Sequence, residues 1–204
     1  TDSIAAFLAA GVDRPGEAVT SLGTTLVLKL LSETRVDEGR HGLYSHWYGR
    51  LWLAGGASNA GGGVLRQHFA EDELSALSAC INPERPSGLD YYPLPRPGER
   101  FPFNDPALPP RLEPRPADRA EFLHGLLEGL ARIEALGYRR LAELGATPLV
   151  RVVSSGGGAG NPVYARIRAR MLGVPVDRAA EHEACYGAAR LARFGTGLFP
   201  GEGD

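Results

Sequence analysis

The sequence predicts an α/β domain, and three observations carry this prediction. β-Prone runs at 18–31 and 150–154 are separated by a long segment, 118–144, in which apolar residues keep helical spacing. A glycine-rich turn at 154–162 follows the second run and ends in Asn-Pro, a cap residue before a proline suited to the first helical position. Strands, helices, strand, glycine turn and helix in this order are typical of α/β folds, whose ligands bind beyond the carboxyl ends of the strands.

Composition narrows the class of protein. The chain has 204 residues, a formal net charge of -2, 43% hydrophobic residues and 23% charged residues, a balance typical of soluble globular proteins. The near-neutral charge argues against a general nucleic-acid or acidic-lipid surface, and no apolar run approaches the length of a membrane span. Two cysteines are too few for a disulfide scaffold and fit a reducing compartment, so we expect a cytoplasmic protein.

The chain begins Thr1-Asp2-Ser3, without methionine, and an apolar segment follows at once. We therefore expect a piece of a longer molecule. Residues 3–10 predict a short buried helix that Gly11 stops. A carboxylate directly before a helix is either its N-cap or a general base for a hydroxyl nucleophile, and the residues alone favour the cap for Asp2.

The elements that follow are predicted from aromatic and β-branched runs, glycine pairs and capping residues. In chain order they are two short strands within 18–31 meeting around Gly23, further strand structure over 42–54 ending at Gly55-Gly56, a helix capped by Ser58 or Asn59 and running through Phe69, and a short helix over 72–80.

A proline-rich arm at about 82–117 holds eleven of the sixteen prolines. A segment this long without regular structure is usually functional or a packing arm. It also carries four aromatic residues, so we expect it to be ordered against the body of the domain; they are Tyr91, Tyr92, Phe101 and Phe103.

The longest helix is predicted to open at Asp118 and to stop at Gly145. After the strand at 150–154, a helix runs from Asn161 to about Gly173. A helix of small residues at about 181–193 closes the domain, and 196–204 look like a tail.

Two glycine turns are candidate binding loops. In the turn at 154–162, missing side chains let a ligand lie on the backbone, and the helix start supplies free N–H groups, which suits a nucleotide. The stretch is neither a Walker A loop nor the dinucleotide fingerprint, and a tight turn needing positive backbone angles is the alternative. Ser21-Leu22-Gly23-Thr24-Thr25 could cradle phosphate oxygens or be a plain hairpin turn. For the third run, 55–63, we favour close packing over binding.

The sequence contains no motif for the other common kinds of site. No His/Cys spacing fits a structural zinc site, and neither His-Glu-x-x-His nor Gly-x-Ser-x-Gly occurs. Cys80 and Cys185 stand among small residues with helical spacing, where we expect core cysteines.

Taken together, five stretches resemble those of one family in the same order. They are Thr1-Asp2-Ser3 with the following helix, Val19 to Thr25, Gly98-Glu99-Arg100-Phe101-Pro102, Ser155 to Asn161, and Glu183 to Ala189. The chain, over about 2–193, resembles the C-terminal domain of the FGGY carbohydrate kinases, which include glycerol, xylulose, ribulose and gluconate kinases.

The resemblance implies two ribonuclease-H-like domains, as in actin and hexokinase, that close on ATP, Mg²⁺ and a sugar. Residues 1–195 would be the second, nucleotide-binding domain, and the N-terminal sugar-binding domain is absent. We therefore expect this chain alone to be inactive. A homodimer is possible; nucleic acid and membrane are not expected as partners.

The family's functional residues carry over to positions that match its motifs. Asp2 matches the catalytic base, and Ser3 beside it would contact the sugar. Gly23 and Thr24 match the positions facing the ATP phosphates. Three positions match the surroundings of adenine and ribose, and Tyr164 would stack beside adenine; the three are Gly157, Gly158 and Asn161.

Residues 1–3 and 21–31 look most like the ribulose/xylulose kinase-like branch of cyanobacteria and plants, which favours D-ribulose, then D-xylulose, as substrate. Two alternatives stay open. One is a non-catalytic nucleotide- or sugar-sensing scaffold of the same fold. The other is a partner-binding domain that uses the proline-rich arm, with residues 86–110 as its interface.

Overall fold

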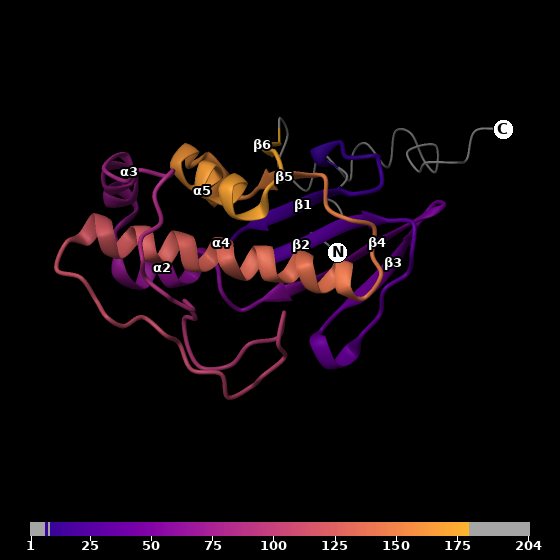
Figure 1. The fold of residues 1–204 in the computed structure, drawn as a ribbon, viewed down its shortest axis with the longest axis horizontal. Helices are drawn as coiled ribbons and strands as arrows, with labels where there is room; N and C mark the ends of the chain where they lie inside the picture. The colour runs from indigo at the N-terminus through magenta and orange to yellow at the C-terminus, as the bar shows by residue number, and fades with distance from the viewer. Residues whose placement is uncertain (1–6, 8, 180–204) are drawn as a thin grey trace.

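A computed structural model describes Phe7 and residues 9–179. Within these residues, a mixed sheet has the strand order β3-β4-β2-β1-β5-β6 (Figure 1). β1 pairs in parallel with β5, and β5 with β6, whereas the other pairs are antiparallel. The strands are β1 (Glu17–Leu22), β2 (Leu26–Ser32), β3 (Tyr44–Tyr48), β4 (Leu51–Ser58), β5 (Arg151–Ser155) and β6 (Val176–Arg178).

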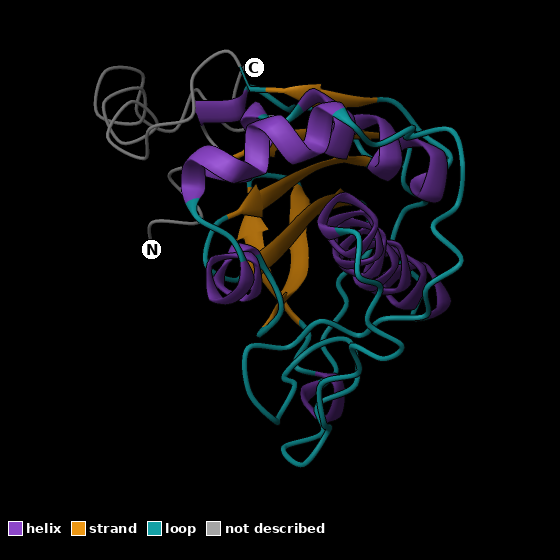
Figure 2. Ribbon diagram, turned by 90° about the vertical axis from the view of Figure 1, so that its left-hand side faces the viewer, coloured by secondary structure: helices purple, strands orange, loops and turns teal. Residues whose placement is uncertain are grey.

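Helices cover this sheet, and the predicted α/β class is confirmed. The described helices are α2 (Gly62–His68), α3 (Glu71–Ala79), α4 (Arg119–Glu143) and α5 (Pro162–Leu172), with short 3₁₀ turns η1 (Gly39–His41) and η2 (Gly157–Gly160). α4 crosses one face of the sheet, and Figure 2 shows it end-on beside the strands. Its start is as predicted, because the Asp118 carboxylate accepts from the backbone N–H groups of Ala120 and Glu121.

The central strand β2 is buried on both faces of the sheet, as its nearly continuous apolar sequence indicates. Leu28 and Leu30 face the main core with residues of α4 such as Leu126. Leu31 faces the opposite side, in a second cluster with Phe7. None of the helices in the described residues is long and apolar enough to cross a membrane.

The β structure predicted over 42–54 is confirmed, but its predicted end at Gly55-Gly56 is wrong. A turn at Gly49 and Arg50 divides the region into β3 and β4, and Gly55-Gly56 lies inside β4 instead of ending it. A methyl group on Gly56 would lie 2.7 Å from the ring of Phe101, so the glycine makes room for the arm.

The predicted helix cap at Ser58 or Asn59 is also wrong, because both residues hold the arm instead. Ser58 Oγ and Asn59 N donate to the buried carboxylate of Glu99, at 2.6 and 2.7 Å. α2 begins only after Gly61.

The arm is part of the domain, as predicted. Tyr91, Leu94 and Phe101 are at most 1% exposed and belong to the main core. Tyr92 donates from its hydroxyl to Glu99 at 3.0 Å, whereas Phe103 remains 43% exposed. Residues 86–110 therefore supply side chains to the core of the domain.

Other predictions differ in outcome. Strand β6 was not predicted, and Cys80 is exposed, not in the core. The turn at Gly11, with φ 70°, and the end of α5 at Gly173, with φ 71°, agree with the sequence. Asp2, Ser3, the predicted helix at 181–193 and the tail lie outside the described residues.

Candidate functional site

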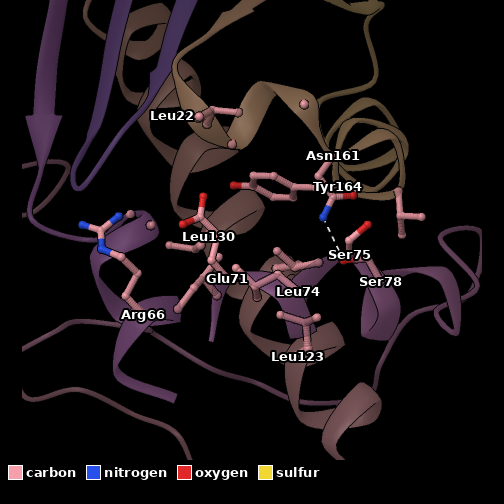
Figure 3. Close-up of a pocket in the computed structure, with 18 of the residues that line it drawn as sticks. Leu22, Arg66, Glu71, Leu74, Ser75, Ser78, Leu123, Leu130, Asn161 and Tyr164 are labelled. Atoms are coloured by element: carbon pink, nitrogen blue, oxygen red, sulfur yellow. Dashed lines mark hydrogen bonds between the residues drawn. The ribbon is translucent and has the colours of Figure 1, made fainter. Parts of the chain in front are cut away.

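A pocket of about 730 Å³ lies where the carboxyl ends of two parallel strands meet four helices (Figure 3). β1 ends at Leu22 and β5 at Ser155, so the turns that follow them are neighbours at one sheet edge. α2, α3, α4 and the start of α5 supply the other walls. Six residues singled out in the sequence line this one pocket; they are Gly23, Thr24, Gly157, Gly158, Asn161 and Tyr164.

The glycines of the second turn divide into two kinds. Gly156 has φ 82°, and a methyl group on it or on Gly158 would lie 2.9 Å from atoms of Leu22, so packing requires both glycines. A methyl group on Gly157 or Gly160 would meet nothing within 4 Å. Packing therefore does not explain these two glycines, which are exposed along the pocket wall.

The hairpin turn between β1 and β2 likewise has room for a side chain at its glycine. A methyl group on Gly23 would be 3.7 Å from the Thr25 carbonyl oxygen, an ordinary contact. The run at Gly61 and Gly62 packs against this turn: Gly62 N donates to Gly23 O at 2.8 Å, and a methyl group on Gly61 would lie 2.6 Å from Thr24 O. The preference for close packing at 55–63 is confirmed, although Gly61 and Gly62 also line the pocket.

Asn161 holds the two sides of the pocket together. Its Oδ1 accepts from Tyr164 N at 3.0 Å and caps α5, as predicted. Its Nδ2 donates to Ser78 Oγ at 2.8 Å, which ties α5 to α3 (Figure 3). The Tyr164 ring is only 4% exposed, and burial raises the pKa of its hydroxyl, which stays protonated at neutral pH.

Two charged residues line the pocket that the sequence analysis did not single out. Arg66 on α2 donates from Nη2 to Thr24 Oγ1 at 2.8 Å. Glu71, the first residue of α3, lies between Arg66 and Asn161 in Figure 3. Only their position shortly after the glycine run at 55–63 could have drawn attention to them.

A fully buried ion pair lies beneath the pocket and fixes α5. Arg168 donates from Nε and Nη2 to both carboxylate oxygens of Glu134 on α4, at 2.6 and 2.7 Å, and from Nη1 to Ser154 Oγ at 2.6 Å. Thr20 Oγ1 on β1 donates to the same carboxylate at 2.6 Å. Burial is the largest single effect and would lower the pKa of Arg168, but the charge of Glu134, its hydrogen bonds to the guanidinium and the nearby Tyr164 and Tyr138 together raise it. The start of α5 is thereby held against β1, β5 and α4.

Apart from Ser75, most of the remaining lining is apolar, with Leu74 from α3 and Leu123, Leu127 and Leu130 from α4. An apolar middle with polar ends suits a ligand that has a flat apolar part and a polar or anionic part. The residues that the structure describes contain no cluster of three His, Cys, Asp or Glu side chains that could hold a metal ion.

Comparison with known proteins assigns the domain. Residues 18–195 match the model of the FGGY family of carbohydrate kinases, C-terminal domain. The chain belongs to this family. The resemblance noted in the sequence is confirmed at the level of the family.

Individual similar proteins are consistent with this family assignment. A glycerol kinase of Gloeobacter violaceus is 30% identical over 97% of this chain and 42% of its own length. A xylulose kinase from Rhodospirillum rubrum superposes with a TM-score of 0.75 at 26% identity, over 95% of this chain and 41% of that one. A structure described as a xyloylose kinase from Brucella ovis has a TM-score of 0.83 at 24% identity, over 96% of this chain and 42% of that one.

Two facts decide which properties of the relatives can be assigned to this chain. The chain spans about 42% of the length of the glycerol kinase that it matches. The named sugars also differ among the relatives. The comparisons therefore establish the family and its ribonuclease-H-like fold, and they leave the sugar open.

Proposed function

We propose that this chain is the ATP-binding half of a kinase that phosphorylates a sugar hydroxyl, with D-ribulose and then D-xylulose favoured. The observation that supports this most is the single pocket in which Gly23, Thr24, Gly157 and Asn161 meet. These residues come from turns more than a hundred positions apart, and each was selected from sequence for nucleotide binding.

The pocket has the dimensions and chemistry that ATP needs. Its volume of about 730 Å³ lies within the range of about 300–1,000 Å³ common for ligand sites. In the proposal, adenine and ribose lie beside Gly157, Gly158 and Asn161, with Tyr164 beneath them. The phosphates extend to Gly23 and Thr24. The open glycines fit this arrangement, since side chains there would project toward the ligand.

For phosphoryl transfer, the protein mainly positions the two reactants, supplies a base and stabilises the charge on the transferred phosphoryl group. Asp2 is the proposed base, which accepts the proton of the attacking sugar hydroxyl, and Ser3 is proposed to contact the sugar. Mg²⁺ would arrive with ATP and would neutralise part of the charge on its phosphates. The remaining sugar contacts would come from an N-terminal domain of the kind that the family places opposite this one, and its closure would exclude water.

The test measures ADP release by the complete gene product with Mg·ATP over D-ribulose, D-xylulose, L-ribulose, gluconate and glycerol. We expect turnover of a ketopentose, with D-ribulose best, and its loss in the matched variant Asp2→Ala. ADP binding without turnover of any sugar would contradict the kinase assignment and favour the non-catalytic scaffold.

A further inference from the structure

The guanidinium of Arg66 is not accounted for by the packing of the domain. Arg66 is exposed and, within the described residues, makes one hydrogen bond, from Nη2 to Thr24 Oγ1 at 2.8 Å, and no ion pair. An arginine side chain has five N–H donors in a planar fork. Most of these donors are therefore available to a ligand at the pocket wall.

The bond to Thr24 is not needed to hold the hairpin turn. Three backbone hydrogen bonds already do so: Gly62 N to Gly23 O at 2.8 Å, Gly63 N to Thr24 O at 3.0 Å, and Leu26 N to Ala60 O at 2.7 Å. A methyl group on Gly62 would lie 3.7 Å from Arg66 Nη1, so the guanidinium lies directly over this glycine. The fork is thus placed beside the open turn at Gly23.

The two ends of the pocket differ in charge. Among the described residues that line it, Arg66 is the sole arginine or lysine, and Glu71 is the sole carboxylate. Figure 3 shows Arg66 at the opposite end from Asn161 and Ser78, with Glu71 and the leucines of α3 and α4 between. An anionic group is therefore most stable at the Arg66 end, and a flat uncharged group fits the other end.

We propose that Arg66 is a specificity-determining residue that binds the terminal phosphates of the nucleotide together with the Thr24 hydroxyl. The inference rests on the proposed function, since it names a residue that binds the phosphates of the nucleotide in the same pocket. It predicts that the site distinguishes ATP and ADP from AMP and adenosine. The planar fork contacts two phosphate oxygens at once, which an ammonium group cannot do in the same way.

The test is a calorimetric titration of the complete gene product with ATP, ADP, AMP and adenosine. Arg66→Ala is expected to weaken ATP and ADP by about ten- to a hundredfold, the range of a charge-assisted hydrogen bond, and to leave adenosine unchanged. Arg66→Lys should recover only part of the loss. Arg50→Ala removes the same charge from the exposed turn between β3 and β4, outside the pocket, and should change none of the four affinities.

The possible failures are distinguishable. If Arg66→Ala weakens adenosine as much as ATP, Arg66 shapes the pocket instead of binding phosphate, and the inference is wrong. If the wild-type protein binds ATP and adenosine equally well, the inference is also wrong, although nucleotide binding stands. If the wild-type protein binds none of the four, the proposed function fails and the inference fails with it.

Discussion

Removing one partner of the buried pair of Arg168 and Glu134 should cost the domain much of its stability. Both side chains are fully buried, and the guanidinium uses three nitrogens in hydrogen bonds of 2.6–2.7 Å to Glu134 and Ser154. Removing either partner leaves the other charge buried without its counterion, which typically costs about 3–5 kcal/mol. Arg168→Met and Glu134→Leu should each lower the free energy of unfolding by that amount.

The magnitude can be measured by urea denaturation and by thermal unfolding. For a chain of this length, 1 kcal/mol shifts Tm by about 2–4 °C, so each single variant should melt roughly 6–20 °C lower. The double variant replaces the pair by apolar groups and should lose clearly less than the sum of the two, since no charge is then left unpaired.

A matched control lies on the same helix. Arg166 pairs with Glu84 at 2.7 Å, but both side chains are more than 60% exposed. Arg166→Met should therefore change the free energy of unfolding by less than about 1 kcal/mol. If Arg168→Met were as mild as this control, the account of α5 as a helix fixed by a buried ion pair would be refuted.

Three further predictions concern single side chains. Asn161→Asp keeps the acceptor that caps α5 but loses the donor to Ser78 and adds negative charge to the pocket. ADP affinity should fall at least about fivefold in calorimetry, with the free energy of unfolding within about 1 kcal/mol of wild type; unchanged affinity would contradict the adenosine assignment. Gly56→Ala places a methyl group 2.7 Å from a buried ring of the arm and should cost about 1–3 kcal/mol in urea denaturation, whereas Gly39→Ala meets nothing within 4 Å and should be neutral. Burial lowers the pKa of Lys29 to about 8 from 10.5, so the unfolded state binds more protons between these values. The free energy of unfolding should therefore rise from pH 8 to 10.5, and Lys29→Met should be up to about 3 kcal/mol more stable at pH 7 and lack the rise. A wild-type profile that falls over this range would contradict the assignment to Lys29.

Local signals in the sequence were enough to predict the helices and turns that carry their own caps. Asp118 and Asn161 cap α4 and α5 through bonds to residues two or three positions away. The two glycine turns could be brought to one site, because β1 and β5 carry them to the same edge of the sheet.

What the sequence could not reveal depends on contacts between distant segments. Gly55-Gly56 looks like a strand end, yet it continues β4 because it pairs with β2, with Phe101 of the arm packed on Gly56. Ser58 looks like a helix cap, yet it holds Glu99, forty-one positions away. Arg66 and the buried Arg168 cannot be distinguished from solvated helix charges until the partners of each are placed.

The measurement that tests the central claim most directly is a crystal structure of the complete gene product with Mg²⁺ and a non-hydrolysable ATP analogue. The account predicts adenine beside Gly157 and Asn161 and the terminal phosphates at Gly23, Thr24 and Arg66. Nucleotide density outside this pocket, or bound in it with the phosphates beside Asn161 and Ser78, would contradict the account.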